Sequence, residues 1–433
     1  MQLEQTVKKY DTYKDSGIEW IGEIPQEWNR TKLKRLLSTP ITDGPHETPE
    51  LLDDGIPFLS AEAVKNNKLN FDLKRGYISP EEHLRFCKKC KPQLNDIFMI
   101  KSGATTGNVA IVDTMEEFSI WSPLALIRAD ENIIYFKYLF YYLQSYVFKN
   151  QVELFWSYGT QQNIGMEVLG NLYIAFSKTA IEQQKIADYL DKKCGEIDRV
   201  VETEKAVIEK LKEYKQSIIT EAVTKGLDKS VPLKDSGIEW IGNIPQHWEI
   251  KRLKTTLRLR NEKVEYNGEK YIGLENVESN SGHYTLSEEN IVDGISNKFY
   301  TNDVLFGKLR PYLAKATIVD FEGLCSSEFL VMQNFKGDNR YLLRILLSYW
   351  FIDIVNSSTY GAKMPRASWD FIGNMVIPYP DTKEQQQIAE YLDKKCTEID
   401  KAIVDKEQVI EKFTEYKKSL IYECVTGKRK VVE

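Results

Sequence analysis

The sequence contains an internal duplication, and this feature constrains its fold more than any other. The fifteen residues from Lys14 to Trp28 recur from Lys234 to Trp248 with only two differences. A second pair of segments, Glu182 to Thr224 and Glu384 to Thr426, agrees at 26 of 43 positions. The first pair is 220 residues apart and the second 202, so the second intervening region is 18 residues shorter. The chain therefore consists of two related halves.

The two intervening regions differ in sequence but keep fragments of a common frame. Asn95 to Phe98 matches Asn302 to Leu305, and Ile111 to Asp113 matches Ile318 to Asp320, in both cases 207 residues apart. The ends and the frame are kept while the contents vary. Such an arrangement suits one scaffold that presents two different recognition surfaces.

Both copies of the long repeat are predicted to be helices. Each copy has a capping-box pattern at its start and a glycine at its end, namely Thr179 with Glu182 and Gly226, and Asp381 with Glu384 and Gly427. These are typical signals for the beginning and end of a helix.

Apolar residues recur along both helices at alternating steps of three and four, which is the pattern of a coiled-coil seam. In the first helix they are Leu190, Cys194, Ile197, Val201, Ile208, Leu211, Ile218 and Ala222. In the second helix they are Leu392, Cys396, Ile399, Ile403, Ile410, Phe413, Leu420 and Cys424. Neither helix can bury such a stripe alone, so we expect the two helices to pair with each other.

A charged residue lies near the middle of each seam, Glu204 in the first helix and Lys406 in the second. If a pseudo-two-fold axis relates the repeats across an antiparallel pair, these equivalent residues meet where the axis crosses, and paired residue numbers add up to 610. This register places Cys194 near Tyr416 and Cys396 near Tyr214. Opposite charges at the crossing would set the register while adding little stability. The alternative is that both charges point to solvent from a differently registered seam.

The regions between the repeats mix strands with helices. Strands are predicted at 97–100, 110–113, 124–128, 304–306, 317–320 and 329–333. The aromatic-rich runs 135–148 and 341–355 are predicted to be helices whose tyrosines and phenylalanines pack in the core. The expected fold is α/β (α+β), with two similar globular domains joined by two long antiparallel coiled-coil helices. The expected bounds are 1–181 for the first domain, 182–226 for the central helix, 227–383 for the second domain and 384–433 for the distal helix with a basic tail.

Three paired features of the chain resemble the specificity (S) subunit of type I restriction-modification systems. They are the two K-D-S-G-I-E-W-I-G-x-I-P-x-x-W openings, the two E-Q-Q-x-I-A-x-Y-L-D helices and the two variable middles. The resemblance covers nearly the whole chain. It implies that each variable middle is a target recognition domain that reads one half of a bipartite sequence in double-stranded DNA. It also implies that the helices space the domains and help to bind two methyltransferase (M) subunits, onto which restriction and motor (R) subunits assemble.

Catalytic motifs are absent from the sequence. There is no N/D-P-P-Y/F tetrapeptide, which an adenine methyltransferase needs, and no G-x-x-x-x-G-K-S/T phosphate loop. Pro380-Asp381 followed by Asp393-Lys394-Lys395 formally matches a nuclease pattern, but Asp381 is a predicted helix cap. We therefore expect a non-catalytic subunit without a cofactor of its own. The resemblance implies that the partner subunits use S-adenosylmethionine, ATP and Mg²⁺.

Metal binding is not expected either. His83, Cys87 and Cys90 form an H-x3-C-x2-C cluster, but a structural zinc site needs four ligands and no second pair follows at finger spacing. The seam cysteines Cys194 and Cys396 are interpreted as small apolar residues.

Composition limits the class of protein further. The formal net charge is −6 at pH 7, which argues against coating nucleic acid through bulk charge. The six cysteines are scattered through a long chain, as expected for free thiols in a reducing compartment. Neither a secretory signal nor a membrane-spanning stretch is recognised. The expectation is a soluble, cytoplasmic protein without membrane contact.

Candidate DNA-contact residues lie on loops rich in polar side chains and glycine, where bases and phosphates can be approached closely. In the first domain they are His46 and Thr48; Lys101, Ser102, Thr105, Thr106 and Asn108; and Thr160, Gln161, Gln162 and Asn163. In the second domain they are Lys308, Arg310, Tyr312, Lys315, Lys363 and Arg366. The segments from Lys101 and from Lys308 occupy equivalent places in the frame, and two different half-sites would require different loops there.

Several of these residues have an alternative interpretation. The segments from Lys101 and Lys308 could be ordinary solvated hairpins, His46 could be a turn residue, and the two glutamines could hydrogen-bond their own loop. The basic groups Arg30, Lys32, Lys34 and Arg35, and Lys251, Arg252 and Lys254, could contact phosphates or be solvated. Trp20, Trp28, Trp240 and Trp248 are expected to anchor the openings rather than stack on bases.

Two functions from other classes compete with DNA recognition. One is a coiled-coil adaptor or scaffold whose two domains bind proteins. The other is a fragment of a single-chain restriction enzyme, which the missing motifs argue against.

Overall fold

The computed structural model of the chain describes residues 8–158, 161–286, 294–361 and 363–431. It contains two compact units: unit 1 is Met1–Thr203 with Val409–Glu433, and unit 2 is Glu204–Gln408. The boundaries between the units fall inside the two long helices, so each helix contributes one part to each unit. None of the helices in the described residues has an apolar stretch that could cross a lipid bilayer.

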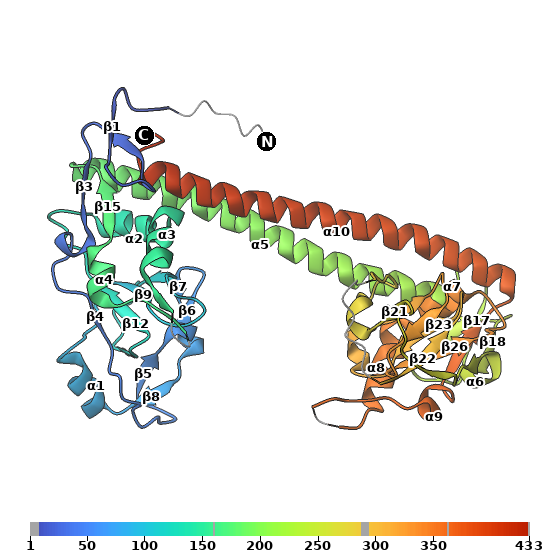
Figure 1. Ribbon diagram of the computed structural model, residues 1–433. Helices are drawn as coiled ribbons and strands as arrows, with labels where there is room; N and C mark the ends of the chain where they lie inside the picture. Colours follow the sequence, from blue (N-terminus) through green and yellow to red (C-terminus); the bar gives the residue numbers. More distant parts are fainter. Residues whose placement is uncertain (1–7, 159–160, 287–293, 362, 432–433) are drawn as a thin grey trace. The chain divides into compact units, whose positions relative to one another are not determined.

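Unit 1 is built around a mixed six-stranded sheet with the strand order β4-β12-β9-β10-β7-β6. The strands are β4 (Thr42–Asp43), β12 (Leu124–Ile127), β9 (Ile97–Ile100), β10 (Val109–Ile111), β7 (Lys68–Leu69) and β6 (Val64–Lys65). A second sheet contains β11 (Ser119–Ile120), β5 (Ile56–Leu59) and β8 (Gly76–Ile78), and α1 (Pro80–Cys87) lies beside it (Figure 1). All four residues of β9 and of β12 are buried, as predicted from their apolar runs.

Unit 2 repeats this plan with two four-stranded sheets. The first has β19 (Arg258–Leu259), β26 (Phe329–Gln333), β23 (Val304–Gly307) and β24 (Ala316–Ile318) in this order. The second has β20 (Lys263–Glu265), β22 (Ile295–Phe299), β25 (Gly323–Cys325) and β21 (Tyr271–Ile272). The central pairs β9–β12 and β23–β26 are both antiparallel, which confirms the related frame.

The repeated Asn-Asp dipeptides build the same turn in both units. Asn95 and Asn302 have φ values of 73° and 70°, a left-handed conformation that asparagine tolerates better than most residues. The following aspartates bind arginines that directly follow two different strands, β12 and β19: Asp96 binds Arg128 at 2.7 Å and Asp303 binds Arg260 at 2.9 Å. The dipeptide is therefore a structural part of the frame.

Each aromatic run predicted as one helix forms two helices. The run 135–148 contains α2 (Phe136–Gln144) and the start of α3 (Tyr146–Phe155), and the run 341–355 contains most of α7 (Asn339–Leu346) and of α8 (Tyr349–Ser357). A serine with extended backbone stands directly before α3 and α8, at positions 145 and 348. The Ser145 hydroxyl donates to the Tyr142 carbonyl and accepts from the Phe148 N–H. Such local bonds compete with a continuous helix.

The remaining elements connect the sheets to the long helices. In unit 1 they are β1 (Tyr13–Asp15), β2 (Glu23–Pro25), β3 (Asn29–Lys32), β13 (Ser157–Tyr158), β14 (Gln162–Asn163), α4 (Met166–Asn171) and β15 (Tyr173–Phe176). In unit 2 they are β16 (Leu233–Asp235), β17 (Asn243–Pro245), β18 (Glu249–Arg252), α6 (Leu253–Thr256), α9 (Trp369–Ile372) and β27 (Val376–Tyr379).

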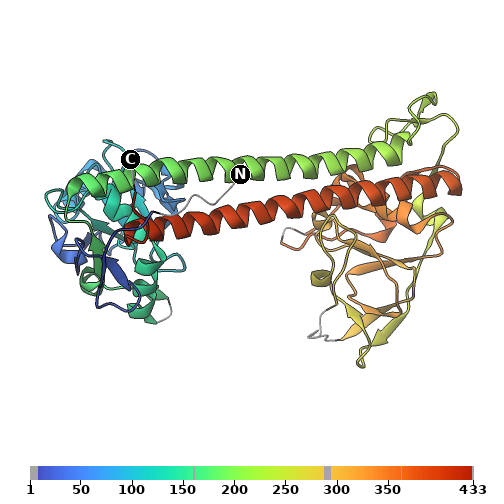
Figure 2. The ribbon, with the colours of Figure 1, turned by 90° about the horizontal axis from the view of Figure 1, so that it is seen from above.

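The long helices are α5 (Ala180–Lys225) and α10 (Thr382–Val425), each beginning two residues before the predicted start. In unit 1, the first part of α5 and the last part of α10 share one apolar cluster, which includes Leu190, Cys194 and Leu420 (Figure 2). In unit 2, the last part of α5 and the first part of α10 share another, which includes Val223 and Leu392. The antiparallel pairing is therefore confirmed within each unit.

The ion pairs that join α5 to α10 include the following three. Lys406 Nζ lies 2.6 Å from Glu204 Oε2, so the predicted seam charges do meet. The other two pairs are repeat equivalents of each other, with Asp198–Lys417 in unit 1 at 2.6 Å and Lys215–Asp400 in unit 2 at 2.7 Å. These lysines interrupt the apolar seam, and each neutralises an aspartate of the opposite helix. Tyr214 is 54% exposed, and its proximity to Cys396 stays a prediction.

The two helix starts are capped differently. Asp381 Oδ1 accepts the Glu384 N–H at 2.8 Å, as the capping-box pattern predicts. At the start of α5 the prediction for Thr179 was wrong, because the Glu182 carboxylate accepts hydrogen bonds from Ser177 and Tyr10 instead. The Ser177 hydroxyl also accepts the Thr179 N–H at 3.2 Å, so it links the residue before the helix to Glu182 in the first turn.

The end of α10 packs against the opening of unit 1. Gly427 has φ 73°, which confirms its role as a carboxyl-terminal cap, and the Tyr13 hydroxyl donates to its carbonyl at 3.1 Å. The buried Trp28 packs against Tyr138, with ring centroids 6.2 Å apart. In unit 2 the indole N–H of the buried Trp248 donates to Glu384. These two tryptophans therefore anchor the openings, as expected.

We expect Gly427→Ala to destabilise unit 1. A Cβ atom at this position would lie 2.3 Å from Pro25 Cδ, and a left-handed residue with a side chain costs about 1–2 kcal/mol even without a clash. Gly195→Ala is the matched control, because Gly195 lies inside α5 with nothing within 4 Å of the added atom. Urea unfolding of the full chain should show a lower midpoint for Gly427→Ala and an equal or higher midpoint for Gly195→Ala. Equal midpoints for both variants would contradict the capping role.

We expect reversal of one charge in the Glu204–Lys406 pair to destabilise unit 2, and reversal of both charges to restore its stability. Glu204→Lys places two ammonium groups together at a half-buried seam position, and we expect a loss of about 1 kcal/mol in unfolding free energy. The combined exchange Glu204→Lys with Lys406→Glu should recover most of that loss. Glu213→Lys, at an exposed site on the same helix, controls for net charge. If the combined variant were no more stable than Glu204→Lys alone, the two residues would not be coupled.

Candidate nucleic-acid interface

The candidate loops of unit 1 lie side by side although they are distant in sequence. The loop after β9 is joined to the strand β14 by two backbone hydrogen bonds, Gly103 N–H to Gln162 O at 3.0 Å and Ile164 N–H to Lys101 O at 2.9 Å. Gly103 and Gly107 have φ values of 101° and 90°, which explains why glycine is needed at these turns. The structure thus brings two of the three predicted segments of unit 1 together.

Asp43 connects the third predicted segment of unit 1, which contains His46 and Thr48, to the loop after β9. This residue ends β4, and its side chain is fully buried. Its carboxylate lies 2.5 Å from Lys89 Nζ, 3.2 Å from Lys101 Nζ and 3.1 Å from His46 Nε2. One buried carboxylate therefore gathers three basic side chains from three separate segments.

Unit 2 contains the equivalent arrangement of loops. The Arg310 N–H donates to the Pro365 carbonyl at 2.7 Å, and the Ala367 N–H donates to the Lys308 carbonyl at 2.9 Å. The segment from Lys308 is therefore joined to the segment that contains Lys363 and Arg366, as the segment from Lys101 is joined to β14 in unit 1.

The tip of the unit 2 loop has a strained backbone. Arg310 and Ala314 have φ values of 50° and 46°, and a short turn at Pro311–Leu313 lies between them. A left-handed conformation is unfavourable for both residue types, and such strain clusters at functional sites. The turn exposes Tyr312, which is 50% accessible.

Some predicted contact residues of unit 1 have exposed side chains, and others have side chains that are held by neighbouring residues. His46, Thr48, Thr105, Gln161 and Asn163 are exposed. Lys101 is only 13% exposed and pairs with Asp43, the Thr106 hydroxyl donates to the Gly103 carbonyl, and Asn108 accepts from Lys149. Ser102 and Gln162 are partly buried, and Thr160 lies outside the described residues.

The predicted residues of unit 2 divide in the same way. Arg310, Tyr312 and Lys363 are exposed, and within the described part of the chain the Arg310 guanidinium forms no hydrogen bond or ion pair. Lys308 is partly buried, and Lys315 donates to the Leu274 carbonyl at 2.6 Å. Arg366 is held by Glu328 at 3.0 Å. The exposed residues are the stronger candidates for contact with a ligand.

Sequence reasoning missed the acidic residues that support these loops. Asp43 directly precedes the candidate segment Gly44–Thr48, so its place was a signal, but a lone aspartate does not reveal its partners. Glu328 carried no signal of its own. A second missed feature is Arg75, whose guanidinium stacks over Trp121 at 4.3 Å from the ring centroid.

The basic groups near the openings are only partly free. Arg30 lies over the Tyr173 ring at 5.4 Å, and Lys251 lies over the Tyr379 ring at 4.1 Å. Lys34, Arg35 and Lys254 are exposed, so contact with phosphates stays a prediction for them.

The other chemical candidates have structural partners. The Asp393 carboxylate, part of the nuclease-like pattern, binds Arg344 at 2.8 Å and Arg340 at 3.4 Å, which leaves it unsuited to a cation. His83 Nδ1 lies 2.9 Å from the Ser119 hydroxyl. Across the described ranges there is no group of three or more histidine, cysteine, aspartate or glutamate residues that could hold a metal ion.

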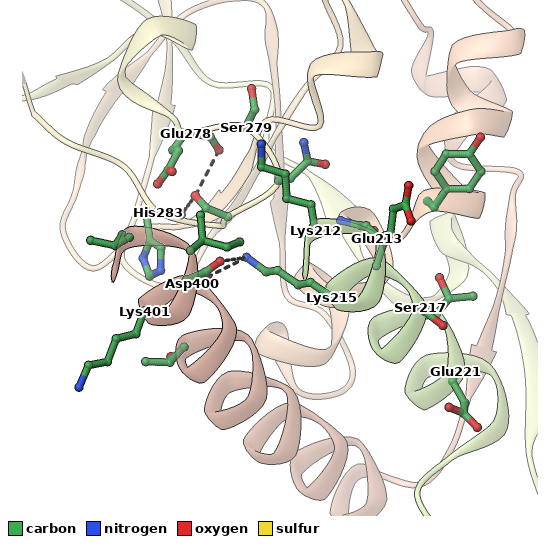
Figure 3. A pocket seen from close by; sticks show the side chains of 18 of the residues that line it. Lys212, Glu213, Lys215, Ser217, Glu221, Glu278, Ser279, His283, Asp400 and Lys401 are labelled. Atoms are coloured by element: carbon green, nitrogen blue, oxygen red, sulfur yellow. Dashed lines mark hydrogen bonds and ion pairs between the residues drawn. The ribbon is translucent and has the colours of Figure 1, made fainter. Parts of the chain in front are cut away.

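An open groove of about 1340 Å³ lies in unit 2 between the helix pair and the loop around Glu278 and His283 (Figure 3). The Lys215–Asp400 ion pair lies in this groove. Acidic and basic residues both line it, including Glu213, Glu221 and Lys401. Because its charge is mixed, the groove does not resemble a binding site for a polyanion.

Both units hold a pair of joined loops at equivalent places on one α/β frame, and the two long antiparallel helices contribute to both units. The sequence profile described as "Type I restriction modification DNA specificity domain" matches residues 25–213 and 246–411. The chain therefore belongs to this family, and it is a type I restriction-modification specificity subunit whose family role is DNA recognition.

Two relatives in this family show the extent of the similarity. The chain is 24% identical over 229 residues to the type I restriction enzyme EcoDI specificity subunit of Escherichia coli, over 48% of this chain and 51% of that protein. This alignment spans about half the length of that relative. Identity to the putative type I restriction enzyme MjaX specificity subunit of Methanocaldococcus jannaschii is 26% over 432 residues, covering 95% of this chain and 96% of the relative.

Solved structures share the fold. A chain from a structure on complex assembly and conformational transition of the type I R-M system aligns with a TM-score of 0.70 and 13% identity, covering 93% of this chain and 98% of the other. The HsdS subunit from Thermoanaerobacter tengcongensis aligns with a TM-score of 0.50 and 14% identity, with the same coverage. These similarities support the fold class and no finer statement.

Asp43 predicts a defined acid sensitivity of unit 1. Burial by itself raises the pKa of the Asp43 carboxyl, but Lys89 and Lys101 outweigh burial, so the pKa lies below 3.8. A carboxylate whose pKa is lower in the folded state stabilises the fold above about pH 4, and this stabilisation is lost as the pH falls. We expect the stability difference between wild type and Asp43→Asn to be largest near neutral pH and to shrink towards pH 3. Urea unfolding at several pH values measures it, and a pH-independent difference would contradict the expectation.

Proposed function

We propose that this chain directs a type I restriction-modification complex to a bipartite DNA sequence, with the loops of unit 1 reading one half and the loops of unit 2 the other. One observation supports this proposal most strongly. Both units hold two joined loops at equivalent places on one frame, while the exposed side chains of these loops differ. Unit 1 offers His46, Thr105 and Gln161, and unit 2 offers Arg310, Tyr312 and Lys363. Different donors in the same frame suit different base sequences.

The chemistry of the exposed residues supports base contacts. Arginine and lysine donate to the major-groove edge of guanine, and glutamine and asparagine pair with adenine. Arg310 is exposed at the tip of a strained turn, and its backbone is held by hydrogen bonds to Pro365 and Leu313. The net charge of −6 is compatible with this role, because affinity then depends on a few placed cations.

We further propose that the chain is non-catalytic and acts in the cytoplasm with two methyltransferase subunits and with restriction subunits. The helix pair is the expected docking surface for the methyltransferase subunits, since many residues of α5 and α10 remain exposed in each unit. S-adenosylmethionine, ATP and Mg²⁺ would be bound by these partners. The absence of the catalytic tetrapeptide and of the phosphate loop from the sequence supports this division of work.

Arg310 gives the sharpest test of modular recognition. Arg310→Ala should weaken or relax one position in one half of the methylated motif by about 1–3 kcal/mol, the usual value of a good base contact. Arg310→Asn serves as a second variant, because asparagine fits a left-handed backbone and so separates loss of the guanidinium from backbone strain. Thr105→Ala, in unit 1, should affect only the other half. Methylome sequencing of cells that carry the complete system measures both halves at once.

Three results would contradict the proposal. Arg310→Ala could leave the motif and the affinity unchanged, which would remove this loop from the interface. The complete complex could show neither a restricted methylation motif nor salt-dependent binding to duplex DNA, as expected for a protein-binding adaptor. The purified chain alone could transfer methyl groups from S-adenosylmethionine, which would exclude a non-catalytic role.

A further inference from the structure

Asp43 has the geometry of a residue that positions other residues. Its carboxylate is fully buried, whereas its partners reach the surface to different degrees: Lys89 is 49%, Lys101 13% and His46 68% exposed. The partners come from the segment after α1, the loop after β9 and the loop after β4. A single buried anion therefore determines where three basic groups lie relative to one another.

The backbone around Asp43 leaves this arrangement little freedom. A Cβ atom on Gly44 would lie 1.9 Å from the Ile120 carbonyl oxygen, so the chain passes directly against β11. The Ser122 N–H donates to the Pro45 carbonyl at 3.2 Å, which attaches the His46 segment to the same place. The Lys101 N–H donates to the Pro123 carbonyl at 2.8 Å. Both segments are thus fixed to the residues between β11 and β12.

The charge of the cluster suits a polyanion. Two lysines face one aspartate, so the cluster is positive even with His46 neutral, and the negative charge lies beneath the surface. Burying a carboxylate is costly unless cations neutralise it, and here two ammonium groups do so. The cluster is therefore a support for cations and not an acidic site of its own.

The carboxylate that supports the candidate loops lies at a different place in each of the two units. In unit 2, Glu328 holds Arg366 at 3.0 Å, and the Lys308 N–H donates to the Glu328 carbonyl. By that backbone bond, Glu328 stands where Pro123 stands in unit 1, and not where Asp43 stands. Each unit supports its loops with a carboxylate at a different position, whereas the Asn-Asp turns of the frame are repeated.

We propose that Asp43 is a positioning residue for the half-site read by unit 1, which it shapes by holding Lys101 and His46 in fixed relative places. Glu328 has the corresponding role for Arg366 and the half-site read by unit 2. This inference rests on the proposed function. It adds that half-site specificity depends on carboxylates that hold other side chains in place and do not themselves contact DNA.

The test uses the full chain assembled with its methyltransferase subunits. Methylation rates are measured on duplexes that carry the wild-type motif or one substitution in either half. Asp43→Asn keeps the size of the side chain and removes its charge. We expect this variant to lose about tenfold or more of its discrimination at one or more positions of one half, with the other half unchanged. Glu328→Gln is the matched control. It should reduce discrimination in the half read by unit 2 and leave the half read by unit 1 unchanged.

A double-mutant cycle separates positioning from a general structural role. If Asp43 acts through Lys101, Asp43→Asn combined with Lys101→Met should discriminate no worse than Lys101→Met alone. This double variant also covers the case in which Asp43→Asn fails to fold, because it removes the buried lysine that would be left unpaired. Circular dichroism at the assay temperature verifies that each variant is folded.

The possible failures can be told apart. If wild type lacks half-specific discrimination, the proposed function itself is wrong. If wild type discriminates but Asp43→Asn alters neither half, or alters both equally while folded, only the positioning role is overturned. Additive effects of the Asp43 and Lys101 changes would overturn it as well.

Discussion

The apolar stripe along α5 and α10 is the constraint on which the rest of the structure depends. Neither helix can bury this stripe alone, so the helices pair, and their ends become part of the two cores: Leu420 and Val425 pack into unit 1, and Ile219 and Val223 into unit 2. Each compact unit therefore includes a part of both long helices. The ion pairs along the seam add little net stability, but they distinguish the correct register from shifted ones.

Both units share a frame of strands and turns, whereas the loops on this frame differ. The opening segments, the left-handed Asn-Asp turns and the central antiparallel strands recur in both units. The loops that follow β9 and β23 occupy the same place but have different backbones, since unit 1 turns on glycines and unit 2 on a strained arginine and alanine. The frame is therefore repeated, and the loops are where the two units differ.

Much of the fold could be predicted because its signals are local. The strands Ile97–Ile100 and Phe329–Gln333 have the predicted bounds, and the other predicted strands differ by a few residues. The breaks at Ser145 and Ser348 were missed, because a serine inside an apolar run is a weak signal and its competing hydrogen bonds form only in context. At the start of α5, Thr179 matched the capping pattern, but Glu182 found better partners in Ser177 and Tyr10.

The sequence by itself determined the duplication, the two long helices and the segments that form the candidate interface. It left two registers open for the helix pair, and the ion pair between Glu204 and Lys406 in the structure decided between them. Periodicity and repetition are properties of the chain alone, so folding was not needed to see them. Only the tertiary structure decided which side chains in those segments are exposed and which are engaged. The Asp43 carboxylate meets Lys89 and Lys101 because β4, β9 and the end of α1 converge, and no pattern in the sequence specifies that lysines so distant in the chain will both lie within 3.2 Å of this carboxylate.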